Sequence, residues 1–222
     1  MELLRSLLDT DGASPRLTVY NEASGSRLDF SAETLDNWAA KVANMLIEEF
    51  DLEPGTGSLI GIDLPGTWQA AVLALGALAA GVDYRIGRPD GAEVQFSMYR
   101  DDGADLDEDF EADLCLVTDD PFGRGVTEIG GELPAGAVDF GPTVRVYGDQ
   151  FTHPTPRLVD KVTTELPANV RALSTGWTDT QTFTAAVLEP LAANGSAVIV
   201  AGLVGTDRLD VITATEKADL RL

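Results

Sequence analysis

One short polar segment, between a predicted strand and a predicted helix, contains the residues best placed for chemistry. Ligands of α/β proteins gather at the carboxyl ends of strands. The hydroxyls of Ser174 and Thr175 and the indole of Trp177 are therefore our candidate ligand-binding groups. A structural explanation competes with this one: Thr178 or Asp179 caps the helix, and Trp177 packs on the core. Both remain open on the sequence alone.

Other residue combinations that could bind a metal or catalyse a reaction have the wrong residue types or the wrong spacing here. Zinc needs three or four His or Cys ligands, and the chain has one of each, His153 and Cys115. The acidic run from Asp105 begins like a calcium-binding EF-hand loop, but Phe110 replaces the required glycine and Leu116 the required glutamate. Neither a nucleophile elbow nor a complete dinucleotide-binding glycine pattern is present. We expect no catalytic residue, no metal site and no cofactor.

The elements that would position the candidate groups alternate between strands and helices. Predicted strands occupy residues 16–20, 27–30, 59–64, 113–118, 144–147, 170–173 and 197–201, with a last one near residue 220. Predicted helices occupy residues 1–9, 31–50, 67–80, 156–166, 178–193 and 206–213. This alternation predicts an α/β fold, layered αβα with a largely parallel sheet. We treat residues 1–222 as a single domain.

The charge of the chain restricts its partners. It carries 37 acidic residues against 15 lysines and arginines, a formal net charge of −22. Such a surface repels nucleic acid and anionic membrane surfaces, so we expect neither as a partner. The acidity serves solubility or a high-salt habitat, or else it attracts a basic protein. The sequence shows no secretory signal, and its most apolar segment, residues 68–82, is too short to span a bilayer. We expect a cytoplasmic protein.

Short motifs follow one another in a known order. Within residues 28–84 come a Leu-Glu-Pro-Gly turn at 52–55, an Ile-Gly-Ile-Asp-Leu-Pro strand at 60–65 and an alanine-rich helix that ends at Gly81. Residues 171–200 carry Arg-Ala-Leu-Ser-Thr and, later, Leu-Glu-Pro-Leu. In order and spacing these segments resemble the adenylate-forming (AMP-binding) superfamily, which includes acyl-CoA synthetases. The resemblance implies that family's N-terminal αβα subdomain. A group of shorter actinobacterial proteins with faint similarity to these enzymes fits best.

The resemblance also implies a phosphate loop, which this sequence lacks. In the family, a Ser/Thr/Gly-rich run ending in Pro-Lys-Gly precedes a segment that Thr152 and His153 resemble. Residues 140–150 occupy that position and have two glycines, no hydroxyl cluster and no lysine. A phosphate cradle needs backbone N–H groups that approach closely, and a cation. The family's magnesium, ribose and C-terminal lysine motifs would lie beyond Leu222. We therefore carry over no functional residue and favour a protein that is not an enzyme.

Three functions follow from these observations. The leading hypothesis is a non-catalytic domain that acts through a protein partner or through its own copy, as a homo-oligomer. The second is a ligand-binding module for an acyl, CoA or nucleotide moiety, in a pocket bordered by Ser174, Thr175 and Trp177. The third is part of an adenylating enzyme that another chain completes. A fold alone does not decide among them.

Overall fold

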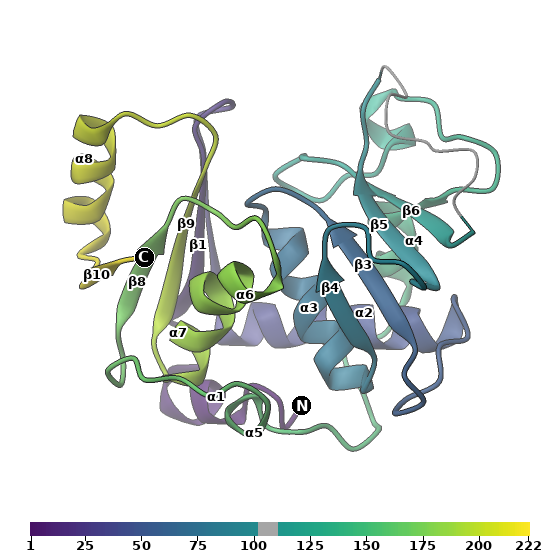
Figure 1. The fold of residues 1–222 in the computed structure, drawn as a ribbon, viewed down its shortest axis with the longest axis horizontal. Coiled ribbons are helices and arrows are strands. Elements are labelled where there is room, and N and C mark those ends of the chain that lie inside the picture. The colour runs from purple at the N-terminus through teal and green to yellow at the C-terminus, as the bar shows by residue number, and fades with distance from the viewer. Residues whose placement is uncertain (102–110) are drawn as a thin grey trace.

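The computed structural model describes residues 1–101 and 111–222. Their strands form two five-stranded sheets, with helices between the sheets and outside them (Figure 1). The acidic run that begins at Asp105 lies outside the described residues. Among the described residues, no helix is both long and apolar enough to span a bilayer.

Sheet A has the strand order β10-β8-β9-β1-β2. β1 and β2 form an antiparallel hairpin, and the other neighbours in this sheet are parallel. Its strands are β1 (Pro15–Asn21), β2 (Ser26–Ser31), β8 (Arg171–Ser174), β9 (Ser196–Ala201) and β10 (Leu220–Arg221).

Sheet B is parallel throughout, with the order β4-β3-β5-β6-β7. Its strands are β3 (Leu59–Asp63), β4 (Asp83–Ile86), β5 (Val94–Met98), β6 (Asp113–Val117) and β7 (Val138–Asp139). The expected α/β fold with parallel strands is thus confirmed. The division of the strands into two sheets was not predicted.

Two long helices, α2 (Ala32–Glu48) and α3 (Trp68–Ala80), lie between the sheets (Figure 1). Ser31 caps α2, because its hydroxyl accepts a hydrogen bond from the N–H of Thr34 at 3.1 Å. α3 is apolar almost all round and buries all but one of its side chains. Gly81 ends α3 in the left-handed conformation. One cluster of buried apolar side chains includes residues of both sheets and both helices. The single-domain assignment stays a prediction.

The remaining helices are short, apart from the last. They are α1 (Arg5–Asp11), η1 (Thr127–Ile129), α4 (Phe140–Val146), α5 (Leu158–Lys161), α6 (Thr180–Phe183), η2 (Thr184–Leu188), α7 (Glu189–Ala192) and α8 (Thr206–Glu216). α6, η2 and α7 form one continuous helical run, as the sequence predicted. Its middle widens to a π-helix just before Pro190, which has no N–H for a regular helical bond.

Two local predictions were wrong. Residues 144–147, expected as a strand, belong mostly to α4, in which Val144 is buried and Val146 is exposed. The helix expected over residues 156–166 shrinks to the four residues of α5. The strands β4, β5 and β7 were not predicted.

Candidate functional site

The polar segment after β8 is first of all a tight turn. The Ser174 hydroxyl donates to the carbonyl of Gly176 at 2.9 Å and accepts from the Gly176 N–H at 3.3 Å. Ser174 is buried, whereas Thr175 is exposed. Asp179 caps α6, and its carboxylate accepts from the Thr182 N–H at 2.8 Å, which confirms the predicted cap. Ser174 and Asp179 therefore shape the backbone here.

Trp177 connects the two sheets. Its indole N–H donates to the carbonyl of Leu64, just after β3, at 3.2 Å. Its ring meets that of Phe183 edge-on, with centroids 4.9 Å apart. Nearby, the hydroxyl of Thr180 accepts from the N–H of Ile86 at 2.9 Å. The loop after sheet A is thus bonded to strand ends of sheet B.

A pocket of about 340 Å³ opens at this junction. It lies at the carboxyl ends of β3, β4 and β5, where ligands of α/β proteins bind. Two members of the polar segment line it, Trp177 and Thr178, whereas Ser174 and Thr175 do not. The remaining lining is Asp63, Leu64, Pro65, Ile86, Gly87, Arg88, Met98 and Arg100.

The pocket combines apolar walls with charge. Asp63 and Arg88 form an ion pair across the ends of β3 and β4, with Nε to Oδ2 at 2.8 Å. Leu64, Ile86 and Met98 supply apolar surface. The lining is thus mixed, with charged and apolar residues in similar measure, in a space large enough for a small ligand. The sequence predicted β3 but did not indicate the lining residues of β4 and β5, since those two strands were not recognised.

Residues 140–150, which the sequence resemblance aligned with the family's phosphate loop, form a helix followed by a turn that is bonded to α2. A Cβ added to Gly141, in the first turn of α4, would lie 2.5 Å from the carbonyl oxygen of Gly123, so the chain already fills this space. After α4, Lys41 donates to the carbonyl of Tyr147 at 2.6 Å. Asn44 donates to the carbonyls of Gly148 and Gln150. These carbonyls face donors on α2, and carbonyl groups do not attract phosphate.

The N-terminal end of α4 already has a carboxylate beside it. Asp139 is buried at the N-cap position and accepts hydrogen bonds from the N–H groups of Val126 and Thr127, at 2.9 and 3.2 Å. A phosphate approaching here would meet a negative charge. The sequence did not predict this contact, since β7 was not recognised.

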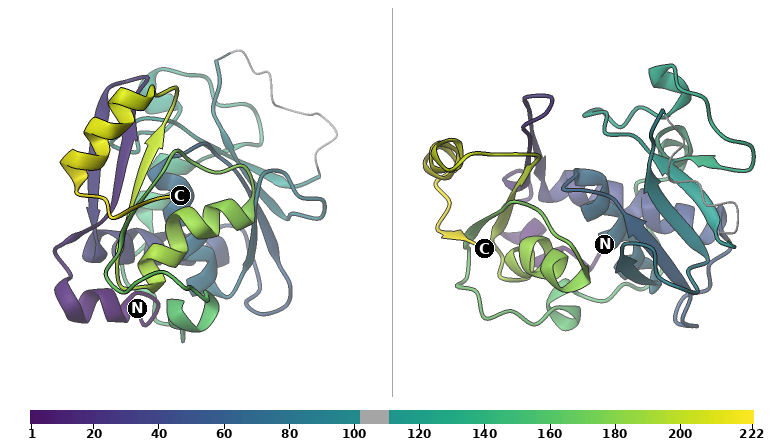
Figure 2. Two further views of the ribbon diagram at one scale, coloured as in Figure 1. Left: turned by 60° about the vertical axis from the view of Figure 1, so that its left-hand side comes forward. Right: turned by 45° about the horizontal axis from the view of Figure 1, so that its top comes forward.

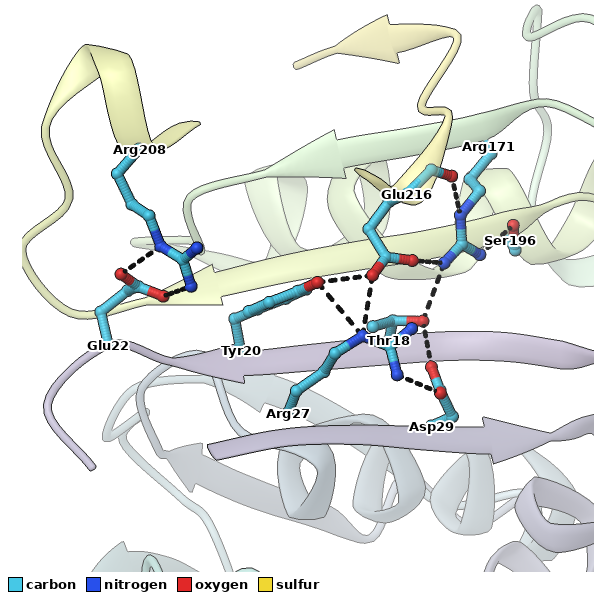
Figure 3. Close-up of polar contacts among 9 residues, drawn as sticks. All are labelled: Thr18, Tyr20, Glu22, Arg27, Asp29, Arg171, Ser196, Arg208 and Glu216. Atoms are coloured by element: carbon cyan, nitrogen blue, oxygen red, sulfur yellow. Dashed lines mark hydrogen bonds and ion pairs between the residues drawn. The ribbon is translucent and has the colours of Figure 1, made fainter. Parts of the chain in front are cut away.

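A second polar cluster lies on the outer side of sheet A (Figure 3). Glu216, at the end of α8, is buried and accepts from the hydroxyl of Tyr20 at 2.5 Å and from Nε of Arg27 at 2.8 Å. Arg171 donates to its other oxygen and, from Nε, to its backbone carbonyl. Burial alone would raise the pKa of Glu216, but the hydrogen bonds from Arg27, Tyr20 and Arg171 outweigh it and lower this pKa to about 2.

The cysteine lies in a setting that does not favour reactivity. Cys115 is fully buried in β6, and burial raises the pKa of its thiol well above the ordinary value. A thiol in that state is a poor nucleophile. The histidine ring of His153 packs against Phe151, with centroids 5.0 Å apart.

Comparisons with known proteins identify the family. No family model matches the sequence. A protein of Mycobacterium tuberculosis (strain ATCC 25618 / H37Rv) described as "TIGR03089 family protein" is 32% identical over 219 residues, which cover 90% of this chain and 88% of that protein. The chain belongs to the TIGR03089 family. This outcome agrees with the expected actinobacterial group.

Several solved structures have a fold similar to that of this TIGR03089 family member. An acyl-CoA synthetase from Brucella canis matches with a TM-score of 0.73 at 14% identity, over 99% of this chain and 47% of that one. Acetoacetyl-CoA synthetase from Streptomyces lividans gives 0.70 at 17%, over 98% and 41%. The anthranilate CoA ligase AuaEII gives 0.69 at 10%, over 100% and 49%.

These matches confirm the expected relationship to the adenylate-forming superfamily at the level of fold. The chain spans less than half the length of the solved structures it matches. Their activities belong to whole proteins of twice this size. What the TIGR03089 family member itself binds or does is therefore argued from its own residues.

Proposed function

We propose that this chain is a non-catalytic relative of the adenylate-forming enzymes that works by binding. One observation carries the proposal: residues 140–150, at the position of the family's phosphate loop, are helical or bonded to α2 through their carbonyl groups. Such a backbone offers no cluster of N–H groups to a triphosphate. Adenylation depends on donors that are already in place where charge develops.

The isolated chain is expected not to bind ATP with Mg²⁺. Titration calorimetry with ATP up to about 1 mM should give no saturable heat, because residues 140–150 lack a glycine-rich cradle and Lys41, the lysine beside them, is bonded to the carbonyl of Tyr147. An acyl-CoA synthetase titrated in the same buffer serves as the positive control. Micromolar binding of ATP to this chain would contradict the proposal.

The proposed binding partner is another protein or a second copy of this chain, as in the leading hypothesis. Large apolar side chains exposed on loops support this choice. Phe122, after β6, is 78% exposed, and Leu203, after β9, is fully exposed. The loop that carries Phe122 is ordered by the buried Asp120, which accepts from the N–H groups of Phe122 and Arg124. A rigid, exposed aromatic residue is a common anchor of protein interfaces. The cytoplasmic location stays a prediction.

Binding of a small ligand is the second candidate, favoured by the pocket beside Trp177. Ser174 and Thr175, also proposed as ligand groups, would act here only by shaping the turn that places Trp177. An acyl, CoA or nucleotide moiety could enter between the apolar wall and the Asp63–Arg88 pair. Completion of an adenylating enzyme by another chain is the third hypothesis, which a stable hetero-complex in pull-downs from the native cell would support.

A ligand of this pocket should raise the melting temperature. Thermal unfolding with about 1 mM laurate, coenzyme A or AMP is expected to show an increase of about 3 °C for the ligand that fits. Trp177→Ala removes one wall and should abolish the increase. Phe122→Ala, at an exposed aromatic residue outside the lining, should keep it. The pocket is not a ligand site if none of the three compounds shifts the wild-type protein.

A further inference from the structure

The helix α8 has a small apolar contact of its own. It lies on the outer side of sheet A, away from α2 and α3, and the right-hand view of Figure 2 shows it nearly end-on there. Only Ile212 and Glu216 among its eleven residues are buried. The apolar cluster at this contact is separate from the main core. In it, Ile212 of α8 packs with Tyr20, Leu173, Val198 and Val200, and the partly buried Val204, Leu209 and Ala218 pack against them. Hydrophobic burial therefore holds α8 weakly compared with α2 or α3.

The buried carboxylate of Glu216 makes most of the other contacts that hold α8 on sheet A. The Glu216 side chain is 4% exposed and ties the end of α8 to three strands, through Tyr20 on β1, Arg27 on β2 and Arg171 on β8 (Figure 3). Arg171 also donates to the hydroxyls of Thr18 and Ser196. Removing one member of such a buried network leaves the other charges unpaired.

The other attachments of α8 are exposed or short. Arg208 pairs with Glu22 at 3.0 Å in a half-exposed ion pair, a kind of contact that stabilises little. After α8, the two residues of β10 join the edge of β8, and the Leu222 N–H donates to the carbonyl of Leu173 at 2.8 Å. Arg221 bonds back to α8 through Asp210 and Thr213, so β10 and α8 are linked to each other.

We infer that α8 and β10 form a strap that opens as one unit while the two sheets and the helices between them stay folded. Opening breaks the Glu216 network and uncovers the apolar row of Tyr20, Leu173, Val198 and Val200 on sheet A. It also frees the hydrogen-bonding edge of β8. The charged and titratable groups bonded to the Glu216 carboxylate are Arg27 on β2, Tyr20 on β1 and Arg171 on β8, and Asp29 on β2 pairs with Arg27 behind them. Local opening of this kind is common where few apolar contacts hold an element.

Hydrogen exchange of the full chain at neutral pH tests the strap. Amides in the interior of α8 and the N–H of Leu222 should exchange at least about tenfold faster than amides of α2 and α3, and should share one dependence on urea concentration. Glu216→Gln should speed their exchange by about tenfold or more. Glu22→Gln, which removes the exposed contact, is the matched control and should change the exchange less than about threefold.

Three outcomes would overturn the inference. One is that α8 exchanges no faster than α2. Another is that the amides of α8 and Leu222 respond separately to urea, as in fraying from one end. The third is that Glu216→Gln changes the exchange of α8 by less than about threefold, which would show that the Glu216 network does not hold the strap closed. The first two outcomes need only the wild-type protein, so the test does not depend on a folded variant.

Discussion

Replacing Gly76 with alanine is expected to lower the free energy of unfolding by about 3 kcal/mol, although alanine favours helices more than glycine does. The reason is the crossing of α2 and α3. A Cβ at Gly76 would lie 2.3 Å from Cγ1 of Val42 and 3.1 Å from the carbonyl oxygen of Ala39. Both neighbours are fully buried, so the added methyl must push the two helices apart.

Urea unfolding followed by circular dichroism measures this loss. Gly148→Ala is the matched control, because its Cβ would have no neighbour closer than 3.8 Å and should change stability by less than about 0.5 kcal/mol. The double variant Gly76→Ala with Val42→Ala should be less destabilised than the sum of the single variants, since the smaller residue relieves part of the clash. Equal stability of Gly76→Ala and the wild type would show that the helices do not pack this closely.

Acid is expected to remove about 3 kcal/mol of stability that Glu216 provides at neutral pH. The pKa of this carboxyl is lowered from 4.5 to about 2 in the folded chain, and each unit is worth about 1.4 kcal/mol. The unfolded chain binds the proton more readily. The contribution of Glu216 is therefore fully present above about pH 4.5 and is lost as the pH falls toward 2.

The comparison of wild type with Glu216→Gln isolates this residue from the other carboxyl groups. Both proteins are unfolded with urea at several pH values between 7 and 2.5. The stability advantage of the wild type should shrink steadily below pH 4.5, because glutamine at position 216 does not titrate. An advantage that stays constant over this range would mean that Glu216 keeps an ordinary pKa in the folded protein.

Prediction from the sequence succeeded where the signal was local. A helix starting at residue 31 and a cap at Thr178 or Asp179 were predicted, because capping depends on residues three positions apart. Gly81 was predicted as the end of the alanine-rich helix that is α3. The short motifs between residues 28 and 84, and again after residue 171, were enough to indicate the fold of the adenylate-forming enzymes.

Prediction from the sequence failed where a local structure depends on contacts with residues far away in the chain. Val144 and Val146 suggested a strand, but packing of Gly141 against the backbone at Gly123 and Gly125 accompanies a helix there. The lining of the pocket beside Trp177 comes largely from the ends of β3, β4 and β5, which are about a hundred residues away in the chain. Ser174 and Thr175 have the right chemistry but do not line it.

By itself, the sequence determined the α/β class, the family resemblance, the strong negative charge and the lack of a glycine-rich, lysine-bearing phosphate loop. These features depend on composition and on residues near one another along the chain. Only the tertiary structure decided that the strands divide into two sheets, that the loop after β8 reaches across to sheet B, and that Glu216 meets Arg27 and Arg171. Each of these depends on contacts between residues that are dozens of positions apart, and their pairing is set by packing of the whole chain.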